Sequence, residues 1–230
     1  ESITGDEASS MRNLKTCSQN FLNKVSLMEK KMTITYQIGS KLYMNITNKC
    51  PCSCTFCIRN NGDGAYGSDS LWLEHDPSIE EIKSAVEKCS LADYSEIIFC
   101  GYGEPTCRLN ELIETAKYMK EKENCPPLRL NTNGLSDLIN EKSTANEIGE
   151  VFDTVSVSLN AGTKEEYMKV TRPKYENAFE AMQNFAVQCS KTSANVMMTV
   201  VDVIPQSEIN AAEQLCKNIG VKLRIRKYDC

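Results

Sequence analysis

The sequence predicts an α/β fold in which a mostly parallel sheet is covered by helices. Segments with strand-like patterns alternate with segments of helical spacing from residue 41 to residue 227. Such alternation predicts parallel strands joined by right-handed crossovers. The chain of 230 residues is also long enough for one domain of this class, which buries about 70% of its unfolded surface. These observations leave open whether the sheet is an open one or a barrel.

The first 31 residues differ from the rest of the chain. They are polar, only weakly helical in pattern, and lack a strong apolar face. We therefore predict two parts: residues 1–31 as an N-terminal appendage of unknown role, and residues 32–230 as the core domain.

The core is expected to begin with a hairpin. Residues 33–38 and 41–47 alternate like strands and flank a turn at Gly39 and Ser40. Pro77 and Ser78 suit the start of the first helix. Six core strands are expected at residues 41–47, 95–100, 128–132, 153–160, 195–201 and 222–227. Five helices are expected at residues 79–89, 109–120, 135–140, 176–189 and 208–219.

Ligand-binding loops follow the carboxyl ends of parallel strands, in open sheets and in barrels alike. The segments in those positions include C-P-C-S-C-T-F-C at 50–57, G-Y-G-E-P at 101–105, N-G at 133–134 and L-N-A-G at 159–162. We therefore expect the cysteine-rich segment to share one face of the protein with these loops.

Composition limits the classes of function. The net charge of −5, from 26 basic and 31 acidic residues, gives no whole-chain attraction to nucleic acid or to anionic membranes. No segment approaches the roughly 18 apolar residues of a membrane span. The acidic, polar N-terminal segment has no signal-peptide pattern, so we expect a cytoplasmic protein. The single histidine, His75, argues against Ser-His-Asp and Cys-His catalysis.

Four of the twelve cysteines lie in residues 50–57. Such a group can form a disulfide knot, a zinc site or an iron–sulfur site. A reducing cytosol disfavours disulfides, and dense cysteine spacing there indicates metal binding or catalysis. Zinc is harder to exclude. The chain has no second C-x-x-C pair downstream, however, and a four-cysteine zinc site in this segment would need an unusually tight loop.

The order of the motifs resembles the radical S-adenosylmethionine (radical SAM) superfamily. Cys50, Cys54 and Cys57 have the C-x-x-x-C-x-Φ-C spacing of that family, with Phe56 as the aromatic Φ. The later loops match in order: G-Y-G-E-P resembles the family's G-G-E-P element, followed by N-T-N-G at 131–134 and S-L-N at 158–160. The resemblance runs from about residue 36 to residue 228. Its finer details are similar to the TatD-associated branch.

The resemblance implies a partial (β/α)6 TIM-like barrel, the radical SAM core, with a [4Fe–4S] cluster and S-adenosylmethionine (SAM) as cofactors. Cys50, Cys54 and Cys57 would bind three irons, Cys52 would bind none, and the fourth iron would stay open for SAM. The residues implied in cofactor binding are Phe56, Gly101, Tyr102, Gly103, Glu104, Asn131, Asn133, Ser158, Asn160 and Arg172.

The implied roles differ within that set. The 101–105 loop would contact the amino group of SAM, the asparagines and the serine its ribose, adenine or carboxylate, and Arg172 its carboxylate. Plainer interpretations also exist. The glycines and asparagines suit ordinary turns, and Arg172 could form a surface ion pair with Glu165 or Glu166.

The implied function is that of a radical SAM enzyme. The cluster cleaves SAM reductively, and the 5′-deoxyadenosyl radical abstracts a hydrogen atom from an unknown substrate. A low-potential donor such as flavodoxin or ferredoxin would supply the electron. The barrel mouth lacks a substrate-binding extension, so we expect a bulky substrate or a pocket completed by a partner protein; nucleic acid is not indicated. The alternative is an iron–sulfur or metal-binding electron-transfer module without SAM cleavage, which has no need for G-Y-G-E-P or Arg172.

Overall fold

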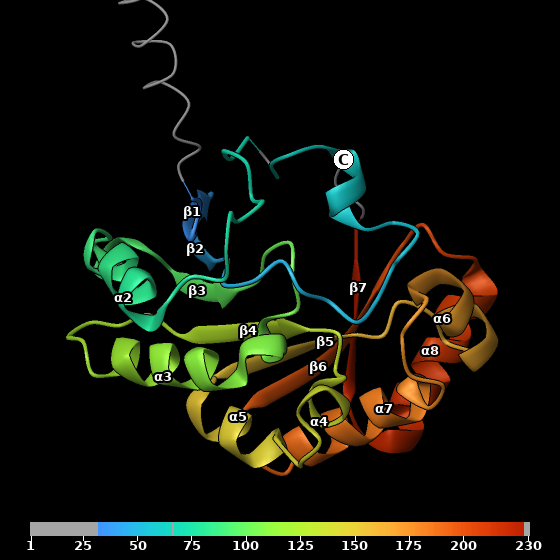
Figure 1. The fold of residues 1–230 in the computed structure, drawn as a ribbon. Coiled ribbons are helices and arrows are strands. Elements are labelled where there is room, and N and C mark those ends of the chain that lie inside the picture. Colours follow the sequence, from blue (N-terminus) through green and yellow to red (C-terminus); the bar gives the residue numbers. More distant parts are fainter. Residues whose placement is uncertain (1–31, 66, 228–230) are drawn as a thin grey trace, which may run out of the picture. The chain divides into compact units, whose positions relative to one another are not determined.

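A computed structural model describes residues 32–65 and 67–227 of the chain. Seven strands form one sheet in sequence order (Figure 1). The first two strands are antiparallel, and all later neighbours are parallel. The strands are β1 (Thr35–Ile38), β2 (Lys41–Met44), β3 (Glu96–Phe99), β4 (Leu128–Thr132), β5 (Thr154–Ser158), β6 (Asn195–Val201) and β7 (Lys222–Arg226).

These strands confirm the predicted α/β class, with an opening hairpin and six parallel core strands. The arrangement is that of the partial TIM-like barrel expected for a radical SAM core. The predicted appendage at residues 1–31 lies outside the described residues. Within the described ranges, none of the helices combines the length and the apolar character needed to cross a membrane.

Seven α-helices and three short 3-10 helices connect the strands in the described residues. The α-helices are α2 (Ile79–Glu87), α3 (Leu109–Lys120), α4 (Ser136–Asn140), α5 (Ala145–Val151), α6 (Lys164–Thr171), α7 (Ala178–Cys189) and α8 (Gln206–Ile219). The 3-10 helices are η1 (Ile58–Asn61), η2 (Leu91–Asp93) and η3 (Pro105–Arg108). Five of the α-helices were predicted; α5 and α6 were not.

The first predicted helix begins where expected. Ser78 accepts a hydrogen bond from the Glu81 backbone at 3.2 Å, and the Glu81 carboxylate accepts one from the Ser78 backbone at 2.7 Å. This reciprocal capping box satisfies two backbone donors that the first turn would otherwise leave unpaired. Such a cap stabilises a helix by about 1 kcal/mol.

The side chains of the strands divide between two faces. One face packs against the helices and is apolar; Met44, Phe99 and Val157 on it are completely buried. The opposite face, which we call the inner face, is largely polar. The registers place Lys41, Glu96, Arg129, Asn131, Ser156, Ser158, Thr199 and Arg224 on it. Because side chains alternate between the two faces along each strand, one face forms the core. The other face forms a polar surface that leads to the loops at the carboxyl ends of the strands.

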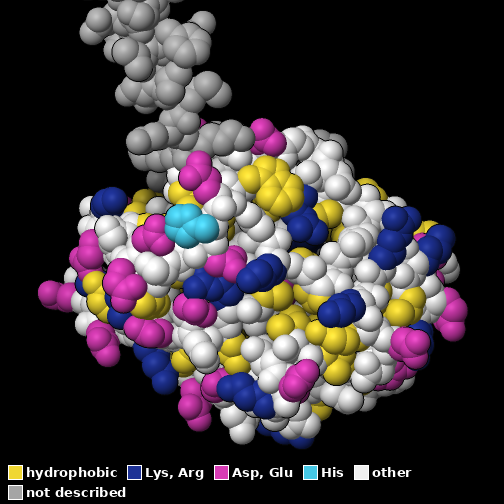
Figure 2. Space-filling view, viewed as in Figure 1, with side chains coloured by type: hydrophobic (Ala, Val, Ile, Leu, Met, Phe, Trp, Pro, Cys, Tyr) yellow, Lys and Arg dark blue, Asp and Glu magenta, His cyan; other side chains and the backbone are white. Residues whose placement is uncertain are grey.

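The outer surface mixes charges of both signs. On the face seen in Figure 2, acidic and basic side chains are interspersed over the helices and loops. This pattern agrees with the nearly balanced composition, and it gives that face no broad region of a single sign.

Candidate functional site

The cysteine-rich loop lies directly after β2 and packs against the end of α6. Four backbone hydrogen bonds of 2.8, 2.9, 3.0 and 3.3 Å join residues 51–55 to residues 170–174. Cys52 forms an isolated antiparallel bridge with Pro173. Arg172 ends α6 in the left-handed conformation, with φ of 45°. The loop is therefore fixed by a second segment of the chain, and this segment carries Arg172.

The four sulfur atoms of the loop have different surroundings. Hydrogen bonds from Cys52 lower the pKa of Cys50 and Cys54, and the same bonds raise the pKa of Cys52. Cys57 instead accepts a hydrogen bond from Arg59 Nε at 3.3 Å. Cys50 and Cys54 thus lose their protons more readily than ordinary cysteines do, and the thiolate is the form that binds metals. Among the described residues, no group of three or more His, Cys, Asp or Glu side chains is arranged as a ready metal site.

The 101–105 loop packs closely on the segment that leads into Cys50. A Cβ atom on Gly103 would lie 2.3 Å from the Thr47 carbonyl oxygen and 2.8 Å from that of Lys49. A Cβ atom on Gly101 would lie 2.1 Å from Oδ1 of Asn45. Glycine is needed at position 103 because two backbone segments approach each other there, and at position 101 because the Asn45 side chain fills the space of a Cβ atom.

Glu104 and Tyr102 point into the protein. Glu104 is 4% exposed, and its carboxylate accepts hydrogen bonds from Thr132 Oγ1 at 2.7 Å and from the Asn133 backbone at 2.7 Å. Burial raises the pKa of Glu104, and these hydrogen bonds act against that change. The hydroxyl of Tyr102 donates to the Gly62 carbonyl at 2.6 Å. Both side chains therefore tie the 101–105 loop to other loops.

The other predicted residues lie on or beside the inner face, apart from Phe56, which is half-buried in the cysteine loop. Asn133 Nδ2 lies 4.0 Å from Cys50 Sγ. Asn131 is on the inner face, and its Oδ1 atom is buried without a donor among the described residues. Ser158 ends β5, and Asn160 follows it in the left-handed conformation, with φ of 64°. The structure thus brings Asn133 to the cysteine loop and leaves Asn131 with an unused acceptor.

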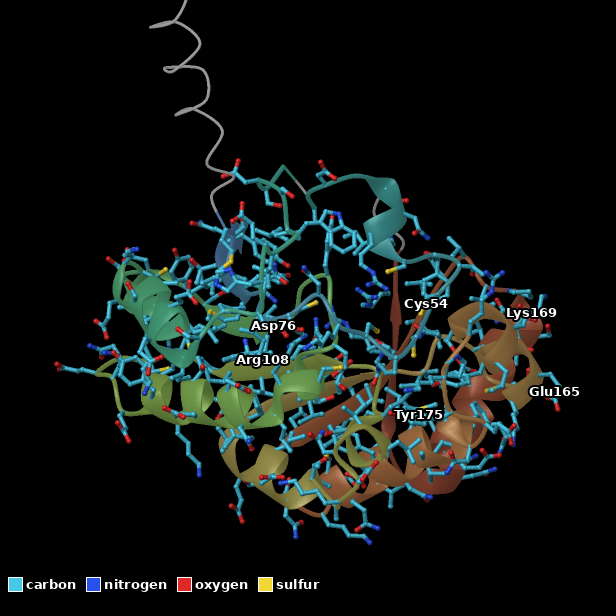
Figure 3. All side chains as sticks on the ribbon, viewed as in Figure 1. Cys54, Asp76, Arg108, Glu165, Lys169 and Tyr175 are labelled. Carbon is cyan, nitrogen blue, oxygen red and sulfur yellow. The ribbon has the colours of Figure 1, made fainter. Side chains whose placement is uncertain are left out.

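A cavity of about 510 Å³ opens beside the cysteine loop. It is lined by Ser53, Cys54, Thr55, Cys57, Arg59, Asn60, Trp72 and Arg172. The Arg59 guanidinium lies 5.9 Å from the centre of the Trp72 ring. Arg172 has no ion-pair partner among the described residues; Glu166 pairs with Lys169 at 2.9 Å instead. Glu165 and Lys169 lie on the outer side of α6, away from Cys54 (Figure 3).

Residues 44–215 match the family model of the radical SAM superfamily. This range covers three quarters of the chain, from the end of β2 into α8. The chain belongs to the radical SAM superfamily. It is therefore an enzyme of SAM-dependent radical chemistry, and the superfamily uses a [4Fe–4S] cluster and SAM with a reductant. Comparison with curated proteins gives no significant match.

The sequence analysis did not identify several residues around the cysteine loop. Asn45 donates to the Leu71 carbonyl at 2.8 Å. Asp76 accepts from Thr47 Oγ1 at 2.8 Å and pairs with Lys49 at 2.7 Å, and Arg108 lies nearby (Figure 3). Polar residues at 45 and 47, where a buried strand ends, are a signal that could have identified the first of these contacts. Asp76 carries no comparable signal, because it lies in a distant loop.

Tyr167 is a further residue of the radical SAM domain that the sequence did not indicate. It is 1% exposed, and its hydroxyl makes no hydrogen bond of normal geometry with a described residue, although the Thr171 side chain lies near it. Burial raises the pKa of this phenol, the neighbouring Cys52 and Cys54 raise it further, and the Thr171 side chain acts against this change. Tyr167 therefore presents an unused donor near the cysteine loop.

Cys100 and Cys107 flank the 101–105 loop of the radical SAM domain. Burial raises the pKa of Cys100, with Asn131 and the charge of Arg226 acting against it. Burial and the Glu104 carboxylate raise the pKa of Cys107 to about 12. Both side chains are therefore neutral thiols at physiological pH.

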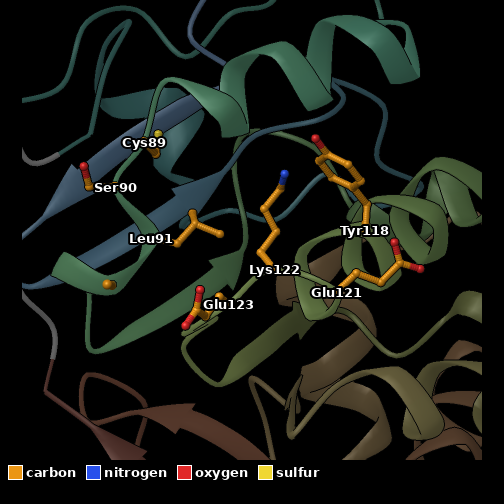
Figure 4. A pocket seen from close by; sticks show the side chains of 8 residues that line it. Cys89, Ser90, Leu91, Tyr118, Glu121, Lys122 and Glu123 are labelled. Carbon is orange, nitrogen blue, oxygen red and sulfur yellow. The ribbon is translucent and has the colours of Figure 1, made fainter.

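A second cavity, of about 550 Å³, lies away from the radical SAM loops (Figure 4). Its lining comes from the segments that precede β3 and β4, at the opposite ends of those strands. Lys122 lies 4.2 Å from the Tyr118 ring centre and pairs with Glu87. None of the predicted site residues lines it, so it is separate from the candidate site.

Proposed function

We propose that Cys50, Cys54 and Cys57 hold a [4Fe–4S] cluster with one open iron, and that the protein acts on its substrate through a radical derived from SAM. When bound, the cluster would supply an electron that cleaves SAM to methionine and a 5′-deoxyadenosyl radical, which abstracts a hydrogen atom from the substrate. The observation that carries this proposal is the C-x-x-x-C-x-Φ-C loop inside the matched domain, held against α6 by backbone hydrogen bonds.

The residues present fit these cofactors. The pKa values of Cys50 and Cys54 are lowered by hydrogen bonds from Cys52, which makes their thiolates easier to form. Asn131 and Tyr167 each leave a buried polar atom without a partner. An unsatisfied buried polar group costs about 1–3 kcal/mol, so such atoms suggest a missing ligand. The donor of Tyr167 suits a cluster sulfur, and the acceptor of Asn131 suits a hydroxyl or amino group of SAM.

We propose different roles for the remaining predicted residues. Arg172 has a planar fork without an acidic partner beside Cys54, which suits the carboxylate of SAM. Glu104 and Tyr102 are engaged within the protein, so we propose that the 101–105 loop meets the amino group of SAM through its backbone. Asn133, Ser158 and Asn160 would complete the cofactor site, with Phe56 beside the cluster and Gly101 and Gly103 allowing the close approach.

We also propose membership of the TatD-associated branch. The segments that carry this resemblance are Y-Q-I-G-S-K-L-Y-M-N-I-T, L-W-L and F-C-G-Y-G-E-P-T, and they contact one another in the structure. Asn45 bonds to the Leu71 carbonyl at 2.8 Å, and the Trp72 and Tyr102 rings meet edge to face at 5.0 Å. These contacts support membership of the branch because they bring its separate motifs together beside the cysteine loop.

The chemistry of the site bears on its partners and compartment. Reductive cleavage of SAM needs an external electron, and we propose a low-potential donor such as flavodoxin or ferredoxin. An open-iron cluster and ten free cysteines among the described residues suit a reducing compartment, so we propose the cytoplasm.

Anaerobic reconstitution tests the proposed function. The protein is loaded with iron and sulfide, reduced with dithionite and mixed with SAM, and 5′-deoxyadenosine is measured by mass spectrometry. We expect its formation to depend on both reductant and cluster. A protein that shows a [4Fe–4S] spectrum but never releases 5′-deoxyadenosine would instead be an electron-transfer module.

Tyr167→Phe is predicted to change the cluster without weakening the fold. Loss of the hydroxyl removes a buried donor that makes no hydrogen bond of normal geometry in the protein, so the apo form should keep its stability or gain up to about 1 kcal/mol. A hydrogen bond to a cluster sulfur favours the more negative reduced state. The variant should therefore have a lower reduction potential, measured by redox titration with electron paramagnetic resonance. Tyr118→Phe, in the separate cavity, is the control and should leave the potential unchanged.

A further inference from the structure

Strand β7 ends the sheet within the described residues. It pairs with β6 along one side, through the register from Lys222 opposite Met197 to Arg226 opposite Val201. Figure 1 shows β7 as the last strand of the sheet, below η1. A strand in this position offers backbone N–H and C=O groups that can pair with an additional extended chain.

One face of β7 carries a row of positive charges. Lys222, Arg224 and Arg226 occupy alternate positions, so their side chains lie on the same face at intervals of about 6.6 Å. All three residues are exposed. None of them forms an ion pair with a described residue. We call these three residues the basic row.

The basic row is on the inner face of the sheet. Arg224 is opposite Thr199, which is opposite Ser158 on the next strand. The charge of Arg226 acts on Cys100, at the end of β3. The row therefore extends from the edge of the sheet toward the loops of the candidate site.

The other face of β7 is apolar. Leu223 packs partly buried against the main core, while Ile225 is 45% exposed. Val203, in the turn that follows β6, is 61% exposed. Two of the three exposed large hydrophobic side chains among the described residues are thus at this end of the sheet. A partner strand here would meet positive charge on one face and apolar surface on the other.

We propose that β7 binds an extended acidic segment of the substrate as an added strand. Acidic side chains at alternate positions would face the basic row, and apolar side chains between them would face Leu223 and Ile225. This inference rests on the proposed function, because the inner face connects β7 to the loops where the radical would form. It names the substrate class as a polypeptide with alternating acidic and apolar residues.

A polypeptide fits this edge better than a nucleic acid does. Backbone pairing requires the alternating donors and acceptors of a peptide, and apolar Ile225 gives a phosphate backbone no partner. The row also has a simpler explanation, since charged side chains on an edge strand discourage aggregation. That explanation predicts no sequence preference in binding, and it can therefore be tested against the proposal.

The test uses three fluorescent peptides and the reconstituted protein. The probes are the alternating peptide E-V-E-V-E-V-E, a block peptide E-E-E-E-V-V-V, and the alternating peptide with backbone N-methyl groups on every second residue. Anisotropy titrations give each dissociation constant at low and at physiological salt. We expect the alternating peptide to bind at least about tenfold more tightly than either of the other two. Equal binding of all three would overturn the proposal.

Variants locate the site. The triple variant Lys222→Gln, Arg224→Gln and Arg226→Gln should weaken binding of the alternating peptide at least about tenfold. A matched variant neutralises three exposed lysines elsewhere, at positions 88, 117 and 191, and should bind like the native protein. If the triple variant does not fold by circular dichroism, Arg224→Glu replaces it. That variant should bind K-V-K-V-K-V-K better than the native protein does. Unchanged binding in these variants would contradict the proposal.

Two further outcomes separate the possibilities. If an oligothymidylate of equal charge displaces the peptide at a lower concentration, the edge is a nucleic-acid site and the proposal is wrong. The 5′-deoxyadenosine assay on the native protein is independent of peptide binding. Release of 5′-deoxyadenosine without peptide binding refutes this inference alone, whereas peptide binding without release refutes the proposed function.

Discussion

Alanine at position 50, 54 or 57 is expected to remove the [4Fe–4S] cluster completely, whereas Cys52→Ala is expected to retain it. Three thiolates bind three of the four irons and leave one iron open. Loss of one thiolate would leave a second iron without a protein ligand, and this destabilises the cluster. Iron and sulfide analysis, the visible absorbance of the reconstituted protein and 5′-deoxyadenosine release measure the effect. In the three ligand variants, all three signals should fall to background.

Cys52 makes this experiment decisive because the structure places it among the candidate ligands. It is 4% exposed, and it is hydrogen-bonded to Cys50 and Cys54, while Cys57 faces Arg59. Loss of the cluster in Cys52→Ala with retention in Cys57→Ala would assign Cys50, Cys52 and Cys54 as the ligands. It would also show that the position of Phe56 does not identify which cysteines bind the cluster.

A control is needed for the loss of a buried thiol as such. Cys189 is completely buried in α7, and its hydrogen bond goes to the Ala145 carbonyl at 3.8 Å. Cys189→Ala should cost about 1 kcal/mol of stability through the small cavity it leaves. Its cluster content should equal that of the native protein, and a deficit would mean that cluster loss reports folding and not ligation.

The sequence predicted the strands and most helices because their apolar periodicities are strong. The predicted bounds of α3, β4 and β6 agree with the structure. Helices α5 and α6, of seven and eight residues, were missed because they are too short to show a clear apolar periodicity. Gly149 lies within α5, where it lowers the helix propensity and packs against Thr192. Helix α6 depends on the Thr163 cap and on its contact with the cysteine loop, and neither is visible as periodicity.

The sequence predicted which loops form the candidate site, but it did not predict the directions of their side chains. Successive parallel strands place their following loops at one end, so the motifs could be assigned to a common face. The direction of each side chain depends on contacts between segments far apart in sequence. Glu104 turns inward because Thr132 and Asn133, about thirty residues later, offer hydrogen bonds there. The donor of Tyr167 is significant only because the folded protein leaves it unpaired.

Gly103→Ala is expected to disrupt both the fold and the cluster site. The new Cβ would lie 2.3 Å from the Thr47 carbonyl oxygen and 2.8 Å from that of Lys49, and these backbone atoms cannot move aside as a flexible side chain could. The hydrogen bond from the Glu104 backbone to the Lys49 carbonyl, at 2.8 Å, would also be strained. Such overpacking costs about 3 kcal/mol. Because Lys49 directly precedes Cys50, the displacement should also lower cluster content.

Gly39→Ala separates the two effects in this last prediction. Gly39 has φ of +57° in the β1–β2 turn, and no atom would approach its new Cβ within 4 Å. An alanine there costs about 1–2 kcal/mol through the left-handed backbone alone. Urea denaturation should therefore show both variants to be destabilised, while only Gly103→Ala loses iron. Normal iron content in a folded Gly103→Ala protein would mean that the loop before Cys50 can shift without disturbing the ligands, and that the close packing of the 101–105 loop serves stability alone.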